Sequence, residues 1–447
     1  MYQQARRNRL DARWEYLDYS HPDVSVATDK QSLTAQARNM QNNDPVMDGV
    51  LSYYVARIVG SNMKVEPMVK NSKGELYISL NKEIKEYYEC WFKNPYLNGT
   101  PGSVGQRWEC STLFRDGEYF GWFKIGHEFE HLTEVPISIQ LLESDSVPNY
   151  LNNEETNLIQ GIQLNKFGRP VFYHVLKNLR EYHSMDTIKV PRREIYHAKL
   201  TKRMGQTRGI TAFHNTLGIF QDANEVKKFE MAAAKVAATI SYQILKDKDA
   251  DIPPEQIVQP GDRKFEARPM SVFDELNPGE VVEVINPNGR PNVQLETFNR
   301  SLYQAAGRSL GIGLGAMLGV FNGSYSAERQ SNILDKMHLA TRTNDFASQT
   351  VEVQYDAFLK TLVLYNLIKL PNDVLPRSLF HKEVTSPTME SIDRLKDVNA
   401  DVAEMNAGIR SKSDIQRGRG YNPAVVNAEI KADATNRNEK EEAEKEE

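Results

Sequence analysis

The sequence has few cysteines and no long apolar runs. Among 447 residues only Cys90 and Cys110 carry thiols, which excludes a disulfide-built scaffold and favours a reducing compartment with both side chains buried. No hydrophobic stretch approaches the length of a membrane-spanning helix, so we expect no membrane segment. The amino-terminal MYQQARRNRLDARWEYLDYS has no apolar stretch behind its basic residues, so we do not expect a secretory signal.

The chain also lacks an excess of positive charge. Lysine and arginine number 55 against 60 aspartates and glutamates, which gives a formal net charge of −5. Because a domain that grips nucleic acid is usually basic, any contact of this protein with DNA is expected to be loose. With 40% hydrophobic and 26% charged residues, the chain has the composition of an ordinary globular protein with more than one core.

The first half of the chain predicts an α+β body. Residues 1–30 are polar and form an expected arm. A helical region then breaks at Asp44-Pro45, because the residue before proline leaves the α region, and a second helix ends at Gly60. Residues 65–200 shift toward strands, as in GEYFGWFKIG and in PISIQLLES, whose apolar residues alternate.

The second half is dominated by helix formers. The stretch DANEVKKFEMAAAKVAATISYQIL predicts a helix with one apolar stripe (Val226, Phe229, Ala233, Val236, Ile240 and Ile244) and alanines on its other faces. A proline-rich, charged excursion follows, in which EVVEVI is an expected strand, and a helix returns from Leu295. After a glycine-rich stretch, Ser326 is the expected N-cap of a helix of about forty residues, on the order of 60 Å long.

The glycine-rich stretch GIGLGAMLGVFNGSYSAERQ contains Gly311-x-Gly313-x-x-Ala316, which satisfies the dinucleotide-binding fingerprint. That fingerprint has to follow a strand, whereas here apolar residues at spacings of three and four predict a preceding helix. The Gly-Lys-Ser/Thr of a P-loop is missing as well. A flexible link between two helices is the preferred interpretation, and a nucleotide enzyme at Gly311 and Gly313 stays open as an alternative.

His127-Glu128-x-x-His131 matches the zincin pattern, in which two histidines one helical turn apart bind zinc and the glutamate acts as a general base. This chemistry needs a helix, yet the flanking segments on both sides are typical of strands. The motif is therefore expected in a hairpin turn, as two solvated loop histidines. A zinc-dependent hydrolase that uses these residues remains the alternative function.

Several segments, taken in order, are similar to one known family. They are AQARNMQNNDPVMDGVLSYYVARIVG, HAKLTKRMGQTRGIT with Gly205-Gln206-x-Arg208-Gly209, NEVKKFEMAAAKVAA, NPGEVVEVINPNGRPNVQLETF, the glycine stretch ending in Asn322-x-x-Tyr325-Ser326, and ADVAEMNAGIRSKSDIQRGRGYNP with Gly408, Ser411 and Gly420. Together they resemble the lambda-type portal proteins of tailed bacteriophages over residues 31–430. The chain departs from the family pattern at Ile312-Gly313, where Val-Pro is usual, and at Asp44, where asparagine is common; the extra glycine predicts a more mobile link.

The resemblance implies the fold of a ring-forming portal subunit with an α/β wing, a two-helix stem, a small clip, a long wing helix and a helical carboxyl-terminal crown. The implied boundaries are an arm at 1–30, the wing at 31–221, stem helices at 222–246 and 295–312, the clip at 247–294, a tunnel loop at 313–325, the long helix at 326–370, the crown at 371–430 and a charged, disordered tail at 431–447.

The resemblance also implies a function without catalysis, cofactor or metal. The expected assembly is a typically dodecameric ring at one capsid vertex of the virion, built in the host cytoplasm, through which double-stranded DNA is packaged and ejected. Its expected partners are the terminase large subunit, a head-tail adaptor, and the major capsid and scaffolding proteins, with no membrane. The implied sites are a DNA-facing tunnel loop (Gly319, Val320, Phe321, Asn322, Gly323, Ser324 and Tyr325), a stem interface (Ala233, Ala234, Ala237 and Ala238) and docking residues in the clip (Lys264 and Arg268). Because neutralising many phosphates would anchor DNA, an acidic chain with an uncharged loop suits a conduit.

Overall fold

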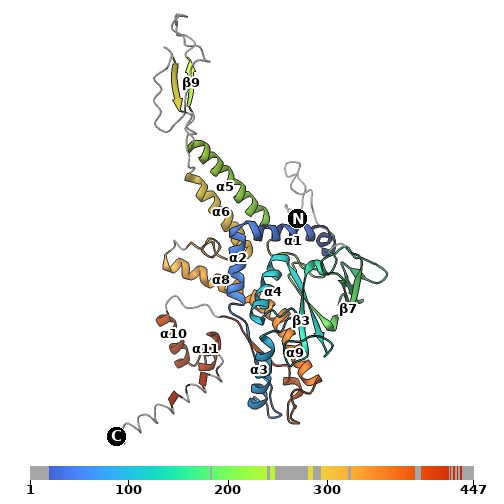
Figure 1. Ribbon diagram of the computed structural model, residues 1–447. Coiled ribbons are helices and arrows are strands. Elements are labelled where there is room, and N and C mark those ends of the chain that lie inside the picture. The colour runs from blue at the N-terminus through green and yellow to red at the C-terminus, as the bar shows by residue number, and fades with distance from the viewer. Residues whose placement is uncertain are drawn as a thin grey trace, which may run out of the picture. The chain divides into compact units, whose positions relative to one another are not determined.

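The computed structural model describes residues 20–181, 184–238, 242–246, 280–284, 293–320, 324–387 and 394–421, and a few isolated residues up to 434. The chain divides into two compact units, of which the first combines Met1–Asn215 with Leu310–Glu447 and the second is Thr216–Ser309. Helices and antiparallel sheets both contribute, as the α+β prediction requires (Figure 1).

The first two helices join at the predicted break. Helix α1 (Pro22–Asn43) ends at Asp44, whose carboxylate accepts a hydrogen bond of 2.7 Å from the Met47 amide and so caps α2 (Pro45–Ile58). Helix α1 begins inside the segment that was predicted to be a polar arm. Gly60 follows α2 with a φ of 58°, the left-handed conformation of a helix end.

Two helices in the region predicted to be rich in strands were not anticipated. Helix α3 (Ile78–Phe92) buries Leu80, Ile84, Tyr88 and Trp91 at helical spacing, and α4 (Gly102–Asp116) carries the buried Cys110. Cys90 on α3 is exposed, so the prediction of two buried thiols is wrong for it. Gly117 ends α4 with a φ of 86°, and an ideal Cβ there would stand 2.0 Å from the carbonyl carbon of Ile210, so no other residue fits.

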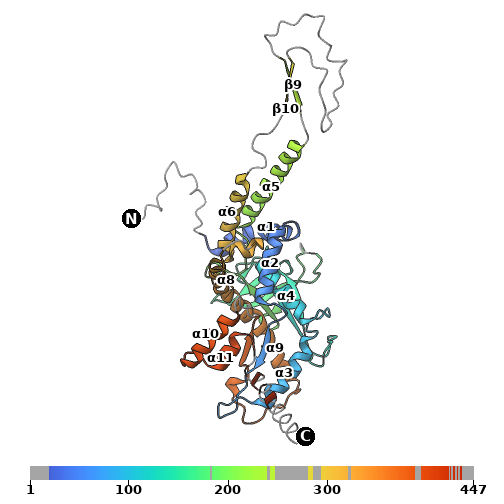
Figure 2. The ribbon, with the colours of Figure 1, turned by 90° about the vertical axis from the view of Figure 1, so that its left-hand side faces the viewer.

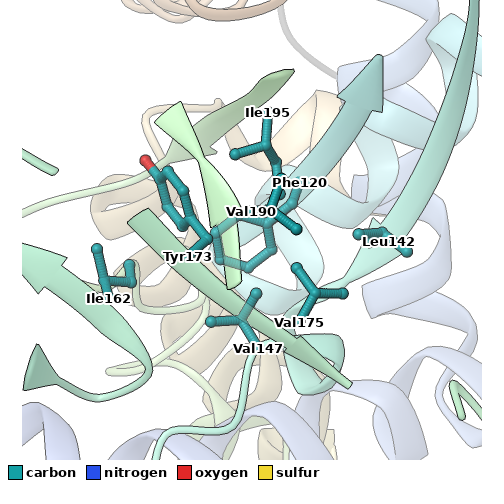
Figure 3. Packing of buried hydrophobic residues seen from close by; sticks show 8 residues of the cluster. All are labelled: Phe120, Leu142, Val147, Ile162, Tyr173, Val175, Val190 and Ile195. Carbon is teal, nitrogen blue, oxygen red and sulfur yellow. The ribbon is translucent and has the colours of Figure 1, made fainter. Parts of the chain in front are cut away.

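Two antiparallel sheets form the core of the first unit. In one sheet β2 (Glu118–Ile125) lies between β3 (Ile137–Glu143) and β8 (Ile195–Lys199), and in the other β4 (Leu158–Ile159), β5 (Ile162–Leu164), β6 (Pro170–Leu176) and β7 (Thr187–Pro191) follow in sequence order. Both strands expected from alternation, β2 and β3, are confirmed. Side chains from both sheets share a buried cluster (Phe120, Leu142, Val147, Ile162, Tyr173, Val175, Val190 and Ile195; Figure 3). A small ribbon of β1 (Lys64–Pro67) and β11 (Lys382–Thr385) completes the sheets of this unit.

In its described residues, the second unit contains two helices and a two-stranded ribbon. Helices α5 (Leu217–Ala238) and α6 (Val293–Leu310) lie side by side (Figure 2), and the Lys227 ammonium donates to the Tyr303 hydroxyl at 2.6 Å. Strands β9 (Tyr242–Lys246) and β10 (Glu280–Val284) pair antiparallel, which confirms the strand expected from EVVEVI. Residues 242–246 are therefore not helical, contrary to the predicted helix that continued through Ile244.

The long helix expected after the glycine stretch is present and contains a π-helical turn. It comprises α8 (Tyr325–Phe346), a π segment at Ala347–Val351 and α9 (Glu352–Leu364). Its N-cap is Ser324 and not Ser326, because the Ser324 hydroxyl accepts from the Ala327 amide. Helices α10 (Arg394–Asn406) and α11 (Lys412–Gly418) follow β11. Within the described ranges, no helix is long and apolar enough to cross a membrane.

Candidate functional site

The segment Gly205-Gln206-x-Arg208-Gly209 builds a buried ionic cluster on β2. The Arg208 guanidinium donates to Glu118 Oε1 at 2.7 Å and to the backbone oxygens of Val147, Gln160 and Ser144 at 2.9, 2.6 and 2.9 Å. The Lys30 ammonium lies 3.1 Å from the same carboxylate oxygen, and His197 Nε2 lies 2.9 Å from Glu118 Oε2. One carboxylate on β2 therefore joins α1, β8 and the loop after β8.

The opposite charges of this cluster stabilise one another in the buried site. Burial alone would raise the pKa of Glu118, but Arg208 and Lys30 hold it well below its usual range. Burial lowers the pKa of Lys30, and it lowers the pKa of His197 to about 4, so that His197 is neutral at physiological pH. The ion pairs and hydrogen bonds of the cluster therefore hold these segments of the fold together.

The same segment fastens α1 through a second carboxylate. Thr207 donates both its amide and its hydroxyl to Asp23, each at 2.7 Å, and Lys30 donates to the Gly209 carbonyl at 2.9 Å. The resemblance in this loop thus corresponds to an anchor for the first helix. The sequence motif identified this loop, but no sequence pattern predicted its contact with Glu118.

The glycine-rich link between α6 and α8 is anchored at both ends. Gly311 has a φ of 72°, and the residue before it, Leu310, accepts a 2.6 Å hydrogen bond from the buried Tyr54 hydroxyl. The link then forms the short helix α7 (Leu314–Leu318), which ends at Gly319 with a φ of 67°. The predicted mobile link is therefore wrong over residues 311–318, where it is held by hydrogen bonds and buried side chains.

Asp335 on α8 provides the main anchor of this link. Its carboxylate accepts a 2.8 Å hydrogen bond from the Gly313 amide, and burial raises its pKa. An ideal Cβ on Gly313 would stand 2.4 Å from the Ser331 hydroxyl, and one on Gly311 would stand 3.2 Å from His338. Helix α8 thus covers the side of these glycines that a pyrophosphate would approach, and helix α6 leads in where the dinucleotide fingerprint needs a strand.

The predicted tunnel-loop residues lie directly after this anchored segment. Gly319 and Val320 are exposed, and space is open around Gly319 where a side chain would begin. Ser324 is exposed as the N-cap of α8, and Tyr325 opens that helix. Phe321, Asn322 and Gly323 lie outside the described residues.

The predicted stem interface lies on α5, and the structure changes the expected arrangement of its faces. Ala234 is exposed and Ala233 half-buried, while the burial of Ala237 and Ala238 lies outside what the structure describes. Phe229, expected within the buried stripe, is 72% exposed. Met231, two residues further along α5, is 57% exposed, and Phe298 on α6 is 51% exposed. Both clip residues, Lys264 and Arg268, lie outside the described residues.

The zincin-like motif occupies the turn between β2 and β3, as its flanking strands predict. His127 and Glu128 are exposed. His131 is half-buried, with Nδ1 2.8 Å from the Ser138 hydroxyl and Nε2 2.7 Å from the Gly126 carbonyl oxygen. Since both ring nitrogens of His131 are engaged, it is not the solvated histidine that we expected, and the turn does not give the one-face geometry that zinc binding needs.

Three hollows are lined by described residues of the first unit. One of about 580 Å³ is bordered by β1 and α3, and its charged residues include Lys85 and Glu66, which pair at 2.7 Å. Another of about 430 Å³ lies between α2 and α4 beside Trp108. The third, of about 30 Å³, adjoins Lys30 and Arg208. No described group of histidine, cysteine, aspartate and glutamate side chains could hold a metal ion.

Comparison with known proteins identifies the family. Residues 7–342 match the sequence profile of the phage portal proteins of the lambda family, and the chain belongs to that family. A search among curated proteins gives no match. Among solved structures, the chain is similar to a chain in the neck of a native GTA particle computed with C12 symmetry (12% identity, 89% of this chain and 94% of that chain covered, TM-score 0.48). Chains in the neck of an empty GTA particle computed with C6 symmetry (14% identity, 89% and 94% covered, TM-score 0.47) and in the virion of a native gene transfer agent particle (13% identity, 88% and 94% covered, TM-score 0.47) are similar too.

Proposed function

We propose that copies of this chain close into a ring, typically of dodecamer size, at one vertex of the capsid, and that double-stranded DNA passes through the ring during packaging and ejection. The proposal rests on membership of the lambda-family portal proteins and on one observation in the second unit. That observation is the set of large apolar side chains that α5 and α6 leave exposed.

A pair of amphipathic helices can bury only the faces that meet. Helices α5 and α6 meet at Tyr303, which contacts Lys227 and lies 6.4 Å from the ring of Phe220. Phe229, Met231 and Phe298 point elsewhere and stay exposed in the single subunit. Because a ring interface joins two different surfaces of identical subunits, exposed apolar side chains on both helices suit contact between α5 of one copy and α6 of the next.

Native mass spectrometry of stem variants tests this proposal. Phe229→Ser should shift the protein toward single subunits, because the interface loses buried apolar area. The free energy of association should fall by roughly 1.5 to 3 kcal/mol per subunit contact. Ala234→Leu should also lower the ring yield, since it overpacks a position that allows close approach. A matched exposed change in the other unit, Phe167→Ser, should leave assembly unchanged. Rings formed equally well by all three variants would refute this interface.

The loop between α7 and α8 is the proposed DNA-facing element of the channel. Its residues Gly319, Asn322, Ser324 and Tyr325 carry no charge, so a passing phosphate backbone meets few fixed cations. Asp335 holds the amide of Gly313 at the start of α7, and Ser324 caps the start of α8.

The proline-rich excursion at 247–294 is the proposed docking surface for the terminase large subunit and then for the head-tail adaptor, with the major capsid and scaffolding proteins meeting other faces of the ring. Charge reversal at Lys264 or Arg268 should spare ring formation and weaken one of the two docking partners, measured by pull-down on assembled rings. Normal binding of both partners would locate docking elsewhere. In this proposal the protein acts as a conduit and platform and not as an enzyme.

A further inference from the structure

A dense group of exposed cations lies at one end of the second sheet of the first unit. We call Lys166, Arg169, Lys189, Arg192 and Arg193 the basic end of this sheet. The antiparallel register places Pro191 beside Phe172, so the residues that follow β7 meet the residues that precede β6 at the same end. All five side chains are exposed.

The basic end is held in place by ordered local structure. The Asn165 side chain accepts hydrogen bonds of 2.9 Å from the amides of Phe167 and Arg169, which fixes the turn between β5 and β6. The Lys189 ammonium lies 4.1 Å from the centre of the Phe172 ring. Val190 points into the core (Figure 3), so its neighbour Lys189 points outward by the alternation of the strand.

The local charge differs in sign from the charge of the whole chain. At the basic end, Arg193 lies 3.5 Å from Glu194. Glu154 and Glu155 are exposed in the turn before β4, where Asn157 donates to the Asn165 carbonyl at 3.3 Å, so these two carboxylates lie on the Lys166 side of the basic end and away from β7. A chain of net charge −5 thus concentrates positive charge at the β6–β7 edge. Such a concentration attracts a polyanion through released counterions.

The exposed side chains of this surface favour nucleic acid over an acidic protein. A protein partner is usually held by a buried apolar centre with a complementary contour. The three hollows described above lie elsewhere, and Phe167 is the main large apolar side chain at the tip, 81% exposed beside Lys166. We propose that the basic end binds the phosphate backbone of double-stranded DNA, without sequence preference, as a site separate from the channel.

Fluorescence anisotropy of the purified chain with a labelled random-sequence duplex, at KCl concentrations between about 50 and 200 mM, tests this assignment. The combined variant Lys166→Gln, Arg169→Gln, Lys189→Gln and Arg192→Gln should lower the slope of log affinity against log salt by about three. A control with the same change in net charge, Lys64→Gln, Lys73→Gln, Lys93→Gln and Lys369→Gln, should change the slope by less than about one. The charge-retaining pair Lys166→Arg and Lys189→Arg should bind like the unmodified chain.

Equal losses in the two glutamine variants would overturn the proposal, because binding would then follow net charge alone. Wild-type affinity in the basic-end variant would overturn it too. Tighter binding of a polyglutamate probe than of the duplex at the basic end would also overturn it, since the preferred ligand of this surface would then be an acidic protein. The basic end lies in the first unit and the exposed apolar side chains of α5 and α6 lie in the second, so the two sets of variants can be tested separately.

Discussion

Arg208 illustrates how single residues of this protein are committed to structure. A buried guanidinium has to find a partner for its N–H groups, and Arg208 finds three backbone carbonyls and Glu118. These groups come from segments far apart in the sequence, so the cluster specifies how the loop after β8 and helix α1 lie on β2. From sequence alone Arg208 was recognisable only as part of a family motif, because a buried ion pair has no local pattern.

Removing the Glu118 carboxylate should destabilise the folded protein. Glu118→Gln leaves Arg208 and Lys30 buried with their counter-charge gone, and we expect a loss of about 3 to 5 kcal/mol in the free energy of unfolding. Urea unfolding at neutral pH measures it. Glu143→Gln is the control, since this half-exposed carboxylate pairs with Arg38 and Arg115 near the surface. It should lower the free energy of unfolding by less than about 1 kcal/mol. Equal effects of the two changes would contradict the role assigned to Glu118.

His197 should make the stability depend on pH. Its pKa in the folded protein is about 4, below the value of about 6.5 of an unfolded chain, so acid favours the unfolded state as pH falls between these values. As pH falls from about 7 to 5, protonation of this histidine should lower the free energy of unfolding by about 2 kcal/mol. His197→Gln should remove that part of the pH dependence. Urea unfolding at both pH values checks it, with the exposed His127→Gln as control. A pH dependence unchanged by His197→Gln would refute it.

At the scale of elements, the sequence predicted strands better than it predicted helix ends or contacts. Strands β2 and β3 were predictable because their apolar residues alternate, and this alternation also placed the zincin-like motif in a turn. The exposure of Phe229 was not predictable, because helical periodicity marks a side chain for burial without saying whether the covering surface belongs to the same subunit. Likewise, counting glycines predicted a mobile link, while the Asp335 contact that fixes it is not local in sequence.

The packing of α7 against α8 makes a separate prediction. Gly313 has a φ of −72°, which alanine tolerates, so any penalty of Gly313→Ala should come from its contact with Ser331. We expect Gly313→Ala to destabilise by about 1 kcal/mol or more, and Ser331→Gly in the same chain to relieve most of that loss. A double-mutant cycle by thermal unfolding measures the coupling. Additive effects would show that Ser331 does not occupy this space.

At the scale of the whole molecule, the proposed channel loop should let DNA slide, whereas the basic end of the second sheet should bind it. The proposed channel loop is uncharged, while the basic end of the second sheet concentrates cations. Net charge alone could not have distinguished the two, because it averages over surfaces that meet different partners.

Adding charge to the channel loop should therefore impair transport. Asn322→Lys with Ser324→Lys adds two cations per subunit, repeated around the ring, and each neutralised phosphate steepens the salt dependence of binding by nearly one power of concentration. We expect normal assembly and slow packaging, with the defect relieved as raised salt screens the added charges. An in vitro packaging assay across salt concentrations measures this. A normal rate, or a defect indifferent to salt, would show that the loop does not face the DNA.

Negative-stain electron microscopy of the purified protein tests whether copies of this chain form a closed channel. We expect closed rings with an axial opening, formed from subunits that contact through the exposed apolar side chains of α5 and α6. Particles that remain single subunits or symmetric dimers at every protein concentration, with the chain folded by circular dichroism, would contradict it.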